Sequence, residues 1–295
     1  MYREFEYRIR QKDANKTILQ FLQERGYSHS VIVHLKGTPE SILKNGIWSY
    51  VNEPLNTGDH LKICLQELTS SEKIPPVPLP LEILYEDDDI LVLNKPADMP
   101  IHPSLNNYEN TLANAVAWYF ANQNLPYTFR CITRLDRDTT GVTLLAKHML
   151  SAAILSVSMQ KHEIQKEYLA ICQGEVPKAG TITAPIARAK DSAIERCVNF
   201  ETGDPAITHY ECLSFKNRLS LVRLNLETGR THQIRVHMAY LGHPLIGDFL
   251  YNPNDDTMTR QALHCHSLRF THPITGEAMH LHAPLPDDMK QVISQ

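Results

Sequence analysis

The sequence predicts an α+β protein, with a mixed, mainly antiparallel β-sheet domain that has flanking helices and a central cleft, and a small α/β domain in front of it. Helix-like and strand-like stretches are interspersed along the 295 residues, and short connections join most of the strand-like stretches. Residues 67–80 are rich in proline and serine and lack a periodic apolar pattern, which is typical of a linker. We therefore expect domains at 1–66 and 81–295.

The front domain, residues 1–66, is expected to contain two helices and a pair of strands. Residues 15–28 carry apolar side chains at helical spacing, and Gly26 is placed to end that helix. A second helix is indicated by three apolar residues, Val31, Ile32 and Leu35. Residues 51–65 resemble two short strands that meet at a turn around Gly58.

The larger domain begins with a predicted hairpin, whose arms are residues 83–85 and 90–94 and whose bend is the acidic triplet 87–89. Apolar spacing predicts helices over 111–124 and over 151–164, the second with Ser151 as its N-cap. Alternating patterns predict four further strands, at 141–148, 166–174, 209–215 and 219–229.

Composition excludes several broad classes of protein. The net charge of −4 gives no overall attraction to nucleic acid, so any such binding must depend on a local patch. The six cysteines form no CxxC pair, which favours reduced thiols, and no apolar run is long enough for a signal peptide or a membrane span. We expect a cytoplasmic protein that has no membrane association and is a monomer.

Common cofactor and hydrolase motifs are missing. The sequence contains neither of the usual glycine-rich phosphate loops, GxxxxGK[ST] and GxGxxG, nor the GxSxG motif of many hydrolases. The triplet 87–89 is best interpreted as a solvated turn, because the ligand spacing of a calcium loop is absent. The late histidines could suggest zinc, but no carboxylate lies at a recognisable offset from them: His264, His266, His272, His280 and His282. We predict no metal and no cofactor.

Two stretches stand out chemically. In TRLDRDTTG, residues 133–141, Asp136 lies between two arginines. In residues 227–248, Thr231 is placed to cap a helix that Gly242 ends, and Arg235 lies between two apolar residues in that helix. A guanidinium in such a setting requires a carboxylate, because an unpaired buried charge is costly. Asp136 is the obvious candidate for that partner.

Several motifs, in order, resemble the RluA family of RNA pseudouridine synthases. They are RLDRDTTGVTLLAK at 134–147 and the stretches 83–104, 166–170, 227–248 and 262–289. The resemblance covers nearly everything from residue 81 to the end. It implies an isomerase that breaks the bond between the uracil nitrogen and the ribose, turns the base, and joins carbon five to the sugar. Such a reaction conserves every atom and requires no cofactor.

The resemblance also assigns roles to residues. Asp136 matches the catalytic aspartate, Tyr168 the tyrosine that stacks on the target base and helps to remove its proton, and Arg235 the arginine paired with the aspartate. A nucleophilic aspartate must stay ionised, and a guanidinium in contact with it favours the charged form. Substrate contacts are expected from the remaining site residues, Arg134, Leu263, Thr139, His232 and Ile234. Of these, Arg134 matches an arginine that enters the RNA helix as the base leaves it.

Two positions depart from the family pattern, since Thr133 replaces a histidine and Thr140 a serine. The front domain resembles a degenerate form of a small RNA-binding domain of ribosomal proteins, with His29 and Ser30 where an arginine is expected after the serine. We expect RNA as the partner, with 23S ribosomal RNA first and transfer RNA second. A catalytically silent RNA-binding protein and a metal-dependent hydrolase remain alternatives, as does glycoside hydrolysis by Asp136 with Asp138.

Overall fold

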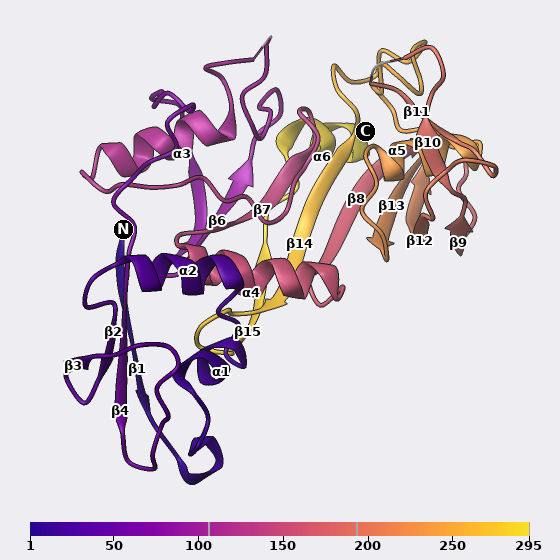
Figure 1. The fold of residues 1–295 in the computed structure, drawn as a ribbon. Helices are drawn as coiled ribbons and strands as arrows, with labels where there is room; N and C mark the ends of the chain where they lie inside the picture. Colours follow the sequence, from indigo (N-terminus) through magenta and orange to yellow (C-terminus); the bar gives the residue numbers. More distant parts are fainter. Residues whose placement is uncertain (106, 193, 295) are drawn as a thin grey trace.

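A computed structural model describes residues 1–105, 107–192 and 194–294 (Figure 1). It confirms the α+β class and the mainly antiparallel sheet. Figure 1 shows the front part of the chain, in indigo and purple, at one end of the molecule, and the long sheet beyond it. Among the described residues, no helix combines the length and apolar character that crossing a membrane would require.

Residues 1–66 form a four-stranded sheet covered by two helices. The strand order is β1-β4-β2-β3. The elements are β1 (Tyr2–Arg8), the 3₁₀ turn η1 (Gln11–Asp13), α1 (Ile18–Gln23), α2 (His29–Gly37), β2 (Ile42–Lys44), β3 (Ile47–Trp48) and β4 (His60–Gln66). Both predicted helices are therefore confirmed. Helix α1 starts with a capping box between Thr17 and Gln20, and the chain then turns at Gly26, which has a φ of +85°.

The strand pair predicted over 51–65 is half wrong. Only its second half is a strand, β4, which pairs with β1 and β2. The first half instead lies at the N-terminus of α1. There the backbone N–H groups of Ile18 and Leu19 donate to the backbone carbonyl groups of Glu53 and Val51. These N–H groups have no partner inside the helix, so the neighbouring loop satisfies them.

The second part of the chain is built on a nine-stranded sheet in the order β5-β6-β7-β14-β8-β13-β12-β9, with β15 paired to β14. Its strands are β5 (Glu82–Glu86), β6 (Ile90–Lys95), β7 (Thr140–Ala146), β8 (Gln165–Gln173), β9 (Ala179–Thr183), β12 (Ile207–Lys216), β13 (Leu219–Leu226), β14 (Leu263–Thr271) and β15 (Ala278–His282). A separate small pair is formed by β10 (Ile186–Arg188) and β11 (Arg196–Val198). The predicted hairpin and the four predicted strands are all present.

The single parallel pairing between named strands in the described chain, β7 with β14, depends on a glycine. Gly141 has a φ of +114°, and a Cβ atom there would lie 2.2 Å from the carbonyl oxygen of Cys265 on β14. No other residue fits so close an approach of two backbones. The close pairing brings the loop just before β7 next to the beginning of β14.

Four helices cover the two faces of this sheet: α3 (Leu112–Ala121), α4 (Met149–Gln160), α5 (Gln233–Tyr240) and α6 (Asp287–Ser294). Leu155 of α4 and Met238 of α5 join the core on one face, whereas α3 and α6 pack in clusters on the other. Gly242 follows α5 with a φ of +88°, as expected for a helix end.

Both predicted N-caps in this region are wrong. The N-cap of α4 lies three residues before the predicted one, and the Nδ1 atom of His148, not Ser151, accepts the capping hydrogen bond. Before α5, the N-cap position is taken by His232 in a left-handed conformation, and the side chain of Thr231 makes no cap. The side chain of Gln233 accepts the N–H of Arg230 there instead.

The front sheet and helices pack directly on the larger part of the chain. Helix α2 lies alongside α4 (Figure 1), and Leu150 belongs to the hydrophobic cluster of residues 1–66. A Cβ atom on Gly26 would lie 2.6 Å from the Ile154 side chain. Residues 67–80, all of them described, contain no helix or strand, and the Asn114 side chain donates to the Pro75 carbonyl.

Asp89 is the polar centre of this contact. Its buried carboxylate accepts hydrogen bonds from the Arg3 Nε atom at 2.8 Å and from the His148 Nε2 atom at 2.9 Å. Burial alone would raise the pKa of Asp89, but the hydrogen bonds from His148 and Arg3 outweigh it and hold the pKa well below its usual range. The carboxylate therefore joins β1, the hairpin bend and the start of α4.

We expect Asp89→Asn to lower the free energy of unfolding at pH 7 by about 2 kcal/mol or more, because two charge-assisted hydrogen bonds are lost in a buried site. A carboxyl group whose pKa is depressed by folding stabilises the protein above its unfolded pKa and loses that effect as the pH falls. When the pH is lowered from about 6 to about 3, the range in which carboxyl groups of an unfolded chain titrate, the free energy of unfolding should therefore fall less for the variant than for the wild type. Denaturant unfolding at several pH values measures this.

The exposed neighbour Asp88 provides the matched control, since its side chain is 78% exposed and lies 3.5 Å from Arg3. Asp88→Asn should change the unfolding free energy by less than about 0.5 kcal/mol. Equal effects of the two substitutions would show that the buried contact does not join the two parts of the chain.

Candidate active site

All eight residues predicted for the site line one pocket of about 80 Å³: Arg134, Asp136, Thr139, Tyr168, His232, Ile234, Arg235 and Leu263. They come from the loop before β7, from β8, from the start of α5 and from the start of β14. The pocket lies on the sheet face that α4 and α5 cover, because Tyr168 and Ile234 belong to the same apolar cluster. Segments about 130 residues apart in sequence therefore converge, as Leu263 and Arg134 show.

Asp136 lies partly buried in this pocket, and its side chain is 29% exposed. The nearest cation is Arg235, whose Nη1 atom is 3.5 Å from the Asp136 Oδ2 atom, and the His232 Nε2 atom is 4.0 Å away. Arg137 turns away, and its Nε atom donates to Asp98 at 2.7 Å. Arg134 is exposed and makes no ion pair within the described ranges. The adjacent arginines therefore do not pair with Asp136, and the charge next to it comes from α5.

The predicted pairing of Arg235 with Asp136 is confirmed at 3.5 Å, but the carboxylate that satisfies the buried guanidinium most closely is Asp248, which the sequence did not predict. The Arg235 Nε and Nη2 atoms donate to the two carboxylate oxygens of Asp248, both at 2.7 Å, and Asp248 is fully buried. This two-bond pair fixes the plane of the guanidinium and leaves Nη1 directed at Asp136. Burial alone would lower the pKa of Arg235, but the ion pair with Asp248 raises it, so that the arginine stays charged.

Asp248 is the last residue of the stretch 227–248, and its place in that stretch was the one feature of the sequence that could have indicated it as a partner of Arg235. Its side chain also accepts the backbone N–H groups of Leu250 and Tyr251, at 3.1 and 3.2 Å. Such a turn holds the carboxylate at a fixed place relative to α5. The separation of Arg235 and Asp248 in the sequence does not predict this pairing, because the chain between them completes α5, reverses its direction and then makes a turn.

Tyr168 and Leu263 form the apolar side of the pocket. They lie on the neighbouring strands β8 and β14, where Tyr168 is paired with Cys265. Burial raises the pKa of Tyr168 well above its ordinary value, and the nearby Cys265 and Asp136 act in the same direction. The phenol is therefore neutral, and its ring offers a flat apolar surface beside the carboxylate.

The loop that carries Asp136 is held by two buried cations. The Lys95 Nζ atom donates to the carbonyl groups of Pro96, Met99 and Arg137 at 2.7, 2.9 and 2.8 Å. Burial lowers the pKa of Lys95 to about 7, although Asp138 and Asp136 oppose this effect. All three contacts of the ammonium group are thus with backbone carbonyls around the loop.

The second cation is Arg260, which connects the loop to the C-terminal helix. Its Nη1 atom donates to the carbonyl groups of Asp138 and Leu263 at 3.3 and 3.4 Å. Its Nε and Nη2 atoms donate to the carboxylate of Asp288 in α6 at 2.7 and 2.9 Å. Helix α6 therefore fixes the direction of a guanidinium that touches both the Asp136 loop and β14.

The threonines near the loop have structural partners. Thr139 accepts a hydrogen bond from the Gln261 side chain at 3.3 Å, while its own N–H donates to the Asp136 carbonyl. The hydroxyl group of Thr133, one of the two departures from the expected pattern, accepts the N–H of Leu144 at 2.9 Å. Thr140 is hydrogen-bonded to His264 at 2.8 Å. The departures from the family pattern therefore anchor β7 and leave the pocket residues in place.

Sequence reasoning missed Lys166, which also lines the pocket. It lies two residues before Tyr168 on β8, so strand alternation puts both side chains on one face, and this spacing was the available signal. Burial lowers the pKa of Lys166, while Cys265 opposes that effect. Its ammonium group makes no hydrogen bond or ion pair with any other described residue.

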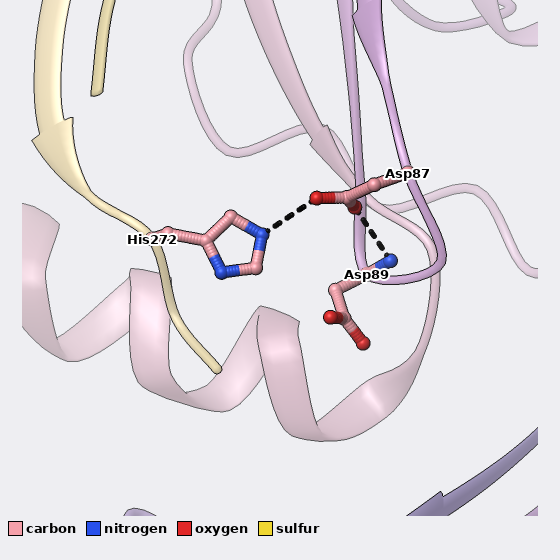
Figure 2. A group of neighbouring side chains, drawn as sticks. All are labelled: Asp87, Asp89 and His272. Carbon is pink, nitrogen blue, oxygen red and sulfur yellow. Dashed lines mark hydrogen bonds and ion pairs between the residues drawn. The ribbon is translucent and has the colours of Figure 1, made fainter. Parts of the chain in front are cut away.

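The acidic bend and a late histidine do come together, as Figure 2 shows for Asp87, Asp89 and His272. Their oxygen and nitrogen atoms lie within 4.8 Å of one another. Asp87 already accepts the N–H groups of Asp89 and Ile90 and a hydrogen bond from His272 at 2.8 Å. Because Asp89 is bonded to Arg3 and His148, the arrangement fits a hydrogen-bonded turn and does not support a metal site.

The chain matches the family model described as RNA pseudouridylate synthase over residues 89–240. The chain belongs to the RluA family of RNA pseudouridine synthases. It is therefore an isomerase, and its substrate is RNA. The matched residues include the Asp136 loop, Tyr168 and Arg235, so most of the pocket, all but Leu263, comes from the part of the chain that the family model matches.

Similar proteins align with most of the length of this pseudouridine synthase. The Uncharacterized RNA pseudouridine synthase YjbO of Bacillus subtilis is 40% identical over 94% of this chain and 98% of that protein. The Ribosomal large subunit pseudouridine synthase D of Haemophilus influenzae is 38% identical over 85% of this chain and 82% of its own. The solved structure of Human RNA Pseudouridylate Synthase Domain Containing 1 covers 75% of this chain and 96% of its own, at 27% identity and a TM-score of 0.60.

The contact between Arg260 and α6 predicts an effect on the rate of catalysis. In Asp288→Asn the guanidinium loses its fixed direction, so the Asp136 loop should move by a fraction of an ångström and kcat should fall about tenfold. The dissociation constant for RNA should stay the same. Asp287→Asn is the matched control, since the Asp287 side chain is 88% exposed and, among the residues that the structure describes, forms an ion pair with Lys290 alone. Equal kcat values for the two variants would contradict the role of Arg260.

Proposed function

We propose that the enzyme converts specific uridines of large-subunit ribosomal RNA into pseudouridine, with Asp136 as the nucleophile and the target base flipped into the pocket. The observation that carries this proposal is the meeting of Asp136, Tyr168 and Arg235 in one pocket. Several relatives, at 38 to 41% identity, are named Ribosomal large subunit pseudouridine synthase D, which favours ribosomal RNA over transfer RNA.

The reaction has to break the bond between C1′ and N1 and form a bond between C1′ and C5. N1 gains a proton and C5 loses one, so the overall change is an isomerisation. Asp136 would attack either the anomeric carbon or the base and leave again when the new bond has formed. The charged guanidinium of Arg235, 3.5 Å away, supports an anionic Asp136 at the start and at the end of this cycle.

Uracil inside a stacked RNA helix cannot reach Asp136, so the proposed cycle begins with extrusion of the nucleotide, at a cost of about a few kcal/mol. Stacking on the Tyr168 ring would return about 1 to 3 kcal/mol of that cost. Arg134 is exposed at the pocket, and its guanidinium is free to occupy the place that the base leaves. Leu263 and Ile234 would pack on the base from the apolar side of the pocket.

The neutral Tyr168 limits how the C5 proton can leave. A phenol with a raised pKa is a weak base, so in this pocket Tyr168 would receive that proton only while it passes its own proton to another group. Asp136 is the nearby carboxylate that becomes free again at this stage. Orientation of the base by stacking is therefore the larger part of the role that we assign to Tyr168.

Cells that lack the protein, complemented with wild type or with Asp136→Asn, test both the reaction and the RNA. Wild type should restore specific pseudouridines in large-subunit ribosomal RNA and leave transfer RNA unchanged. Asp136→Asn should restore none, because an amide is a poor nucleophile, and its turnover in vitro should fall by at least about 10³-fold. Chemical mapping of pseudouridine in both RNA classes gives the result.

Binding separates loss of chemistry from loss of substrate. The purified Asp136→Asn protein should bind the same RNA with an affinity within about threefold of wild type, because phosphate contacts dominate affinity. Substantial turnover by this variant would refute the role of Asp136. Restoration of pseudouridine in transfer RNA alone would refute the assignment to ribosomal RNA.

A further inference from the structure

A second pocket of about 540 Å³ opens beside the catalytic pocket. It is lined where β8 begins, β13 ends and β12 passes, by His162, Gln165, Lys166, His209, Asn225, Leu226, Glu227 and Thr228. Lys166 and Leu226 line both pockets and therefore form the wall between them. Anything that occupies the catalytic pocket is next to the second pocket, across the side chains of Lys166 and Leu226.

Some polar side chains of the second pocket have hydrogen-bond partners within the protein, and others have none among the described residues. His209 is hydrogen-bonded to Glu227 at 2.6 Å and to Thr181 at 2.8 Å, so the side chains of His209 and Glu227 already have partners. The exposed carboxamides of Gln165 and Asn225 make no side-chain hydrogen bond with any residue that the structure describes. A carboxamide offers both donors and an acceptor, and so it can pair with the edge of a nucleobase.

Lys166 differs from the carboxamides because it is a cation without a carboxylate partner in the described chain. Its neighbour Tyr168 is on the same face of β8, within the catalytic pocket. Phosphate is the anion that RNA brings to such a place, and contacts to phosphate position the chain without reading its sequence. Glu227 makes the second pocket itself unfavourable for a phosphate, which leaves that space to a base.

We propose that the second pocket holds the nucleotide next to the target uridine, with Lys166 bound to the phosphate between the two and with Gln165 and Asn225 reading the neighbouring base. The inference rests on the proposed function, since it requires a flipped nucleotide in the catalytic pocket. Enzymes that flip a base choose their substrates partly through contacts to the flanking nucleotides. The subsite thus accounts for how a pocket that fits any uracil selects particular uridines.

The test uses hairpins cut from ribosomal RNA around a uridine that the enzyme modifies in cells. The nucleotide on each side of that uridine is changed to all four bases in turn, and kcat/KM and the dissociation constant are measured for each RNA. Wild type should prefer one flanking base at one of the two positions, by about tenfold, as expected for a lost base contact. In the double variant Gln165→Ala/Asn225→Ala this preference should shrink to within about twofold.

Lys166→Ala should act differently, because a phosphate contact is the same for every sequence. It should lower the affinity for all hairpins by a similar factor and reduce the slope of log K against log salt by about one. Gln291→Ala, which removes an exposed carboxamide of α6, is the control and should behave as wild type. Melting temperatures equal to wild type show that the exposed Gln165 and Asn225 are not needed for folding.

Three results would overturn the subsite: no flanking preference in wild type, an unchanged preference in the double variant, or a change of preference in Lys166→Ala. Failure of the proposed function has a different signature, namely no pseudouridine in any hairpin. The dissociation constants, measured also with Asp136→Asn, report the flanking preference without turnover. Pseudouridine formation therefore tests the proposed function, and the dissociation constants test the subsite, so that the two proposals can fail independently.

Discussion

The ion pair between Arg235 and Asp248 is the interaction on which the geometry of the candidate active site depends. Two bonds of 2.7 Å fix the guanidinium inside the protein and leave one nitrogen facing Asp136. Removing two charges from water is costly, and a buried pair of this kind seldom adds stability on balance. Its benefit lies in position, because a cation that is already oriented does not have to reorganise when substrate arrives.

The remaining structure supports that arrangement from the other side of the pocket. Asp136 lies on a loop, and loops are less precise than strands or helices. Lys95 and Arg260 compensate by binding the carbonyl groups that follow Asp136, so the backbone is held and the carboxylate stays available. The parallel contact of β7 with β14 at Gly141 places this loop beside Leu263 and Tyr168. Buried cations thus surround the loop without neutralising its aspartate directly.

The sequence predicted the elements whose signals are local. The hairpin with arms 83–85 and 90–94, the strands β7, β8, β12 and β13, and most helices follow from alternation or helical spacing, and the residues of the candidate site come from their motifs. The strands β1, β9, β14 and β15 were not predicted. The prediction failed where a side chain finds its partner through the tertiary fold: His148 and not Ser151 caps α4, and Asp248 binds Arg235 in addition to the predicted Asp136. It also missed Lys166, whose position became meaningful only when two pockets were seen to share it. Such partners depend on tertiary contacts that spacing along the chain does not encode.

The central claim is that Asp248 acts on catalysis through Arg235, and a double-mutant cycle on the single-turnover rate tests it most directly. Asp248→Asn releases the guanidinium, and Arg235→Lys cannot make the two-bond pair, so each should slow the reaction. The double variant should be no slower than the slower single variant, with a coupling free energy of at least about 1.5 kcal/mol. Effects that simply add would contradict the claim and show that the two residues act independently.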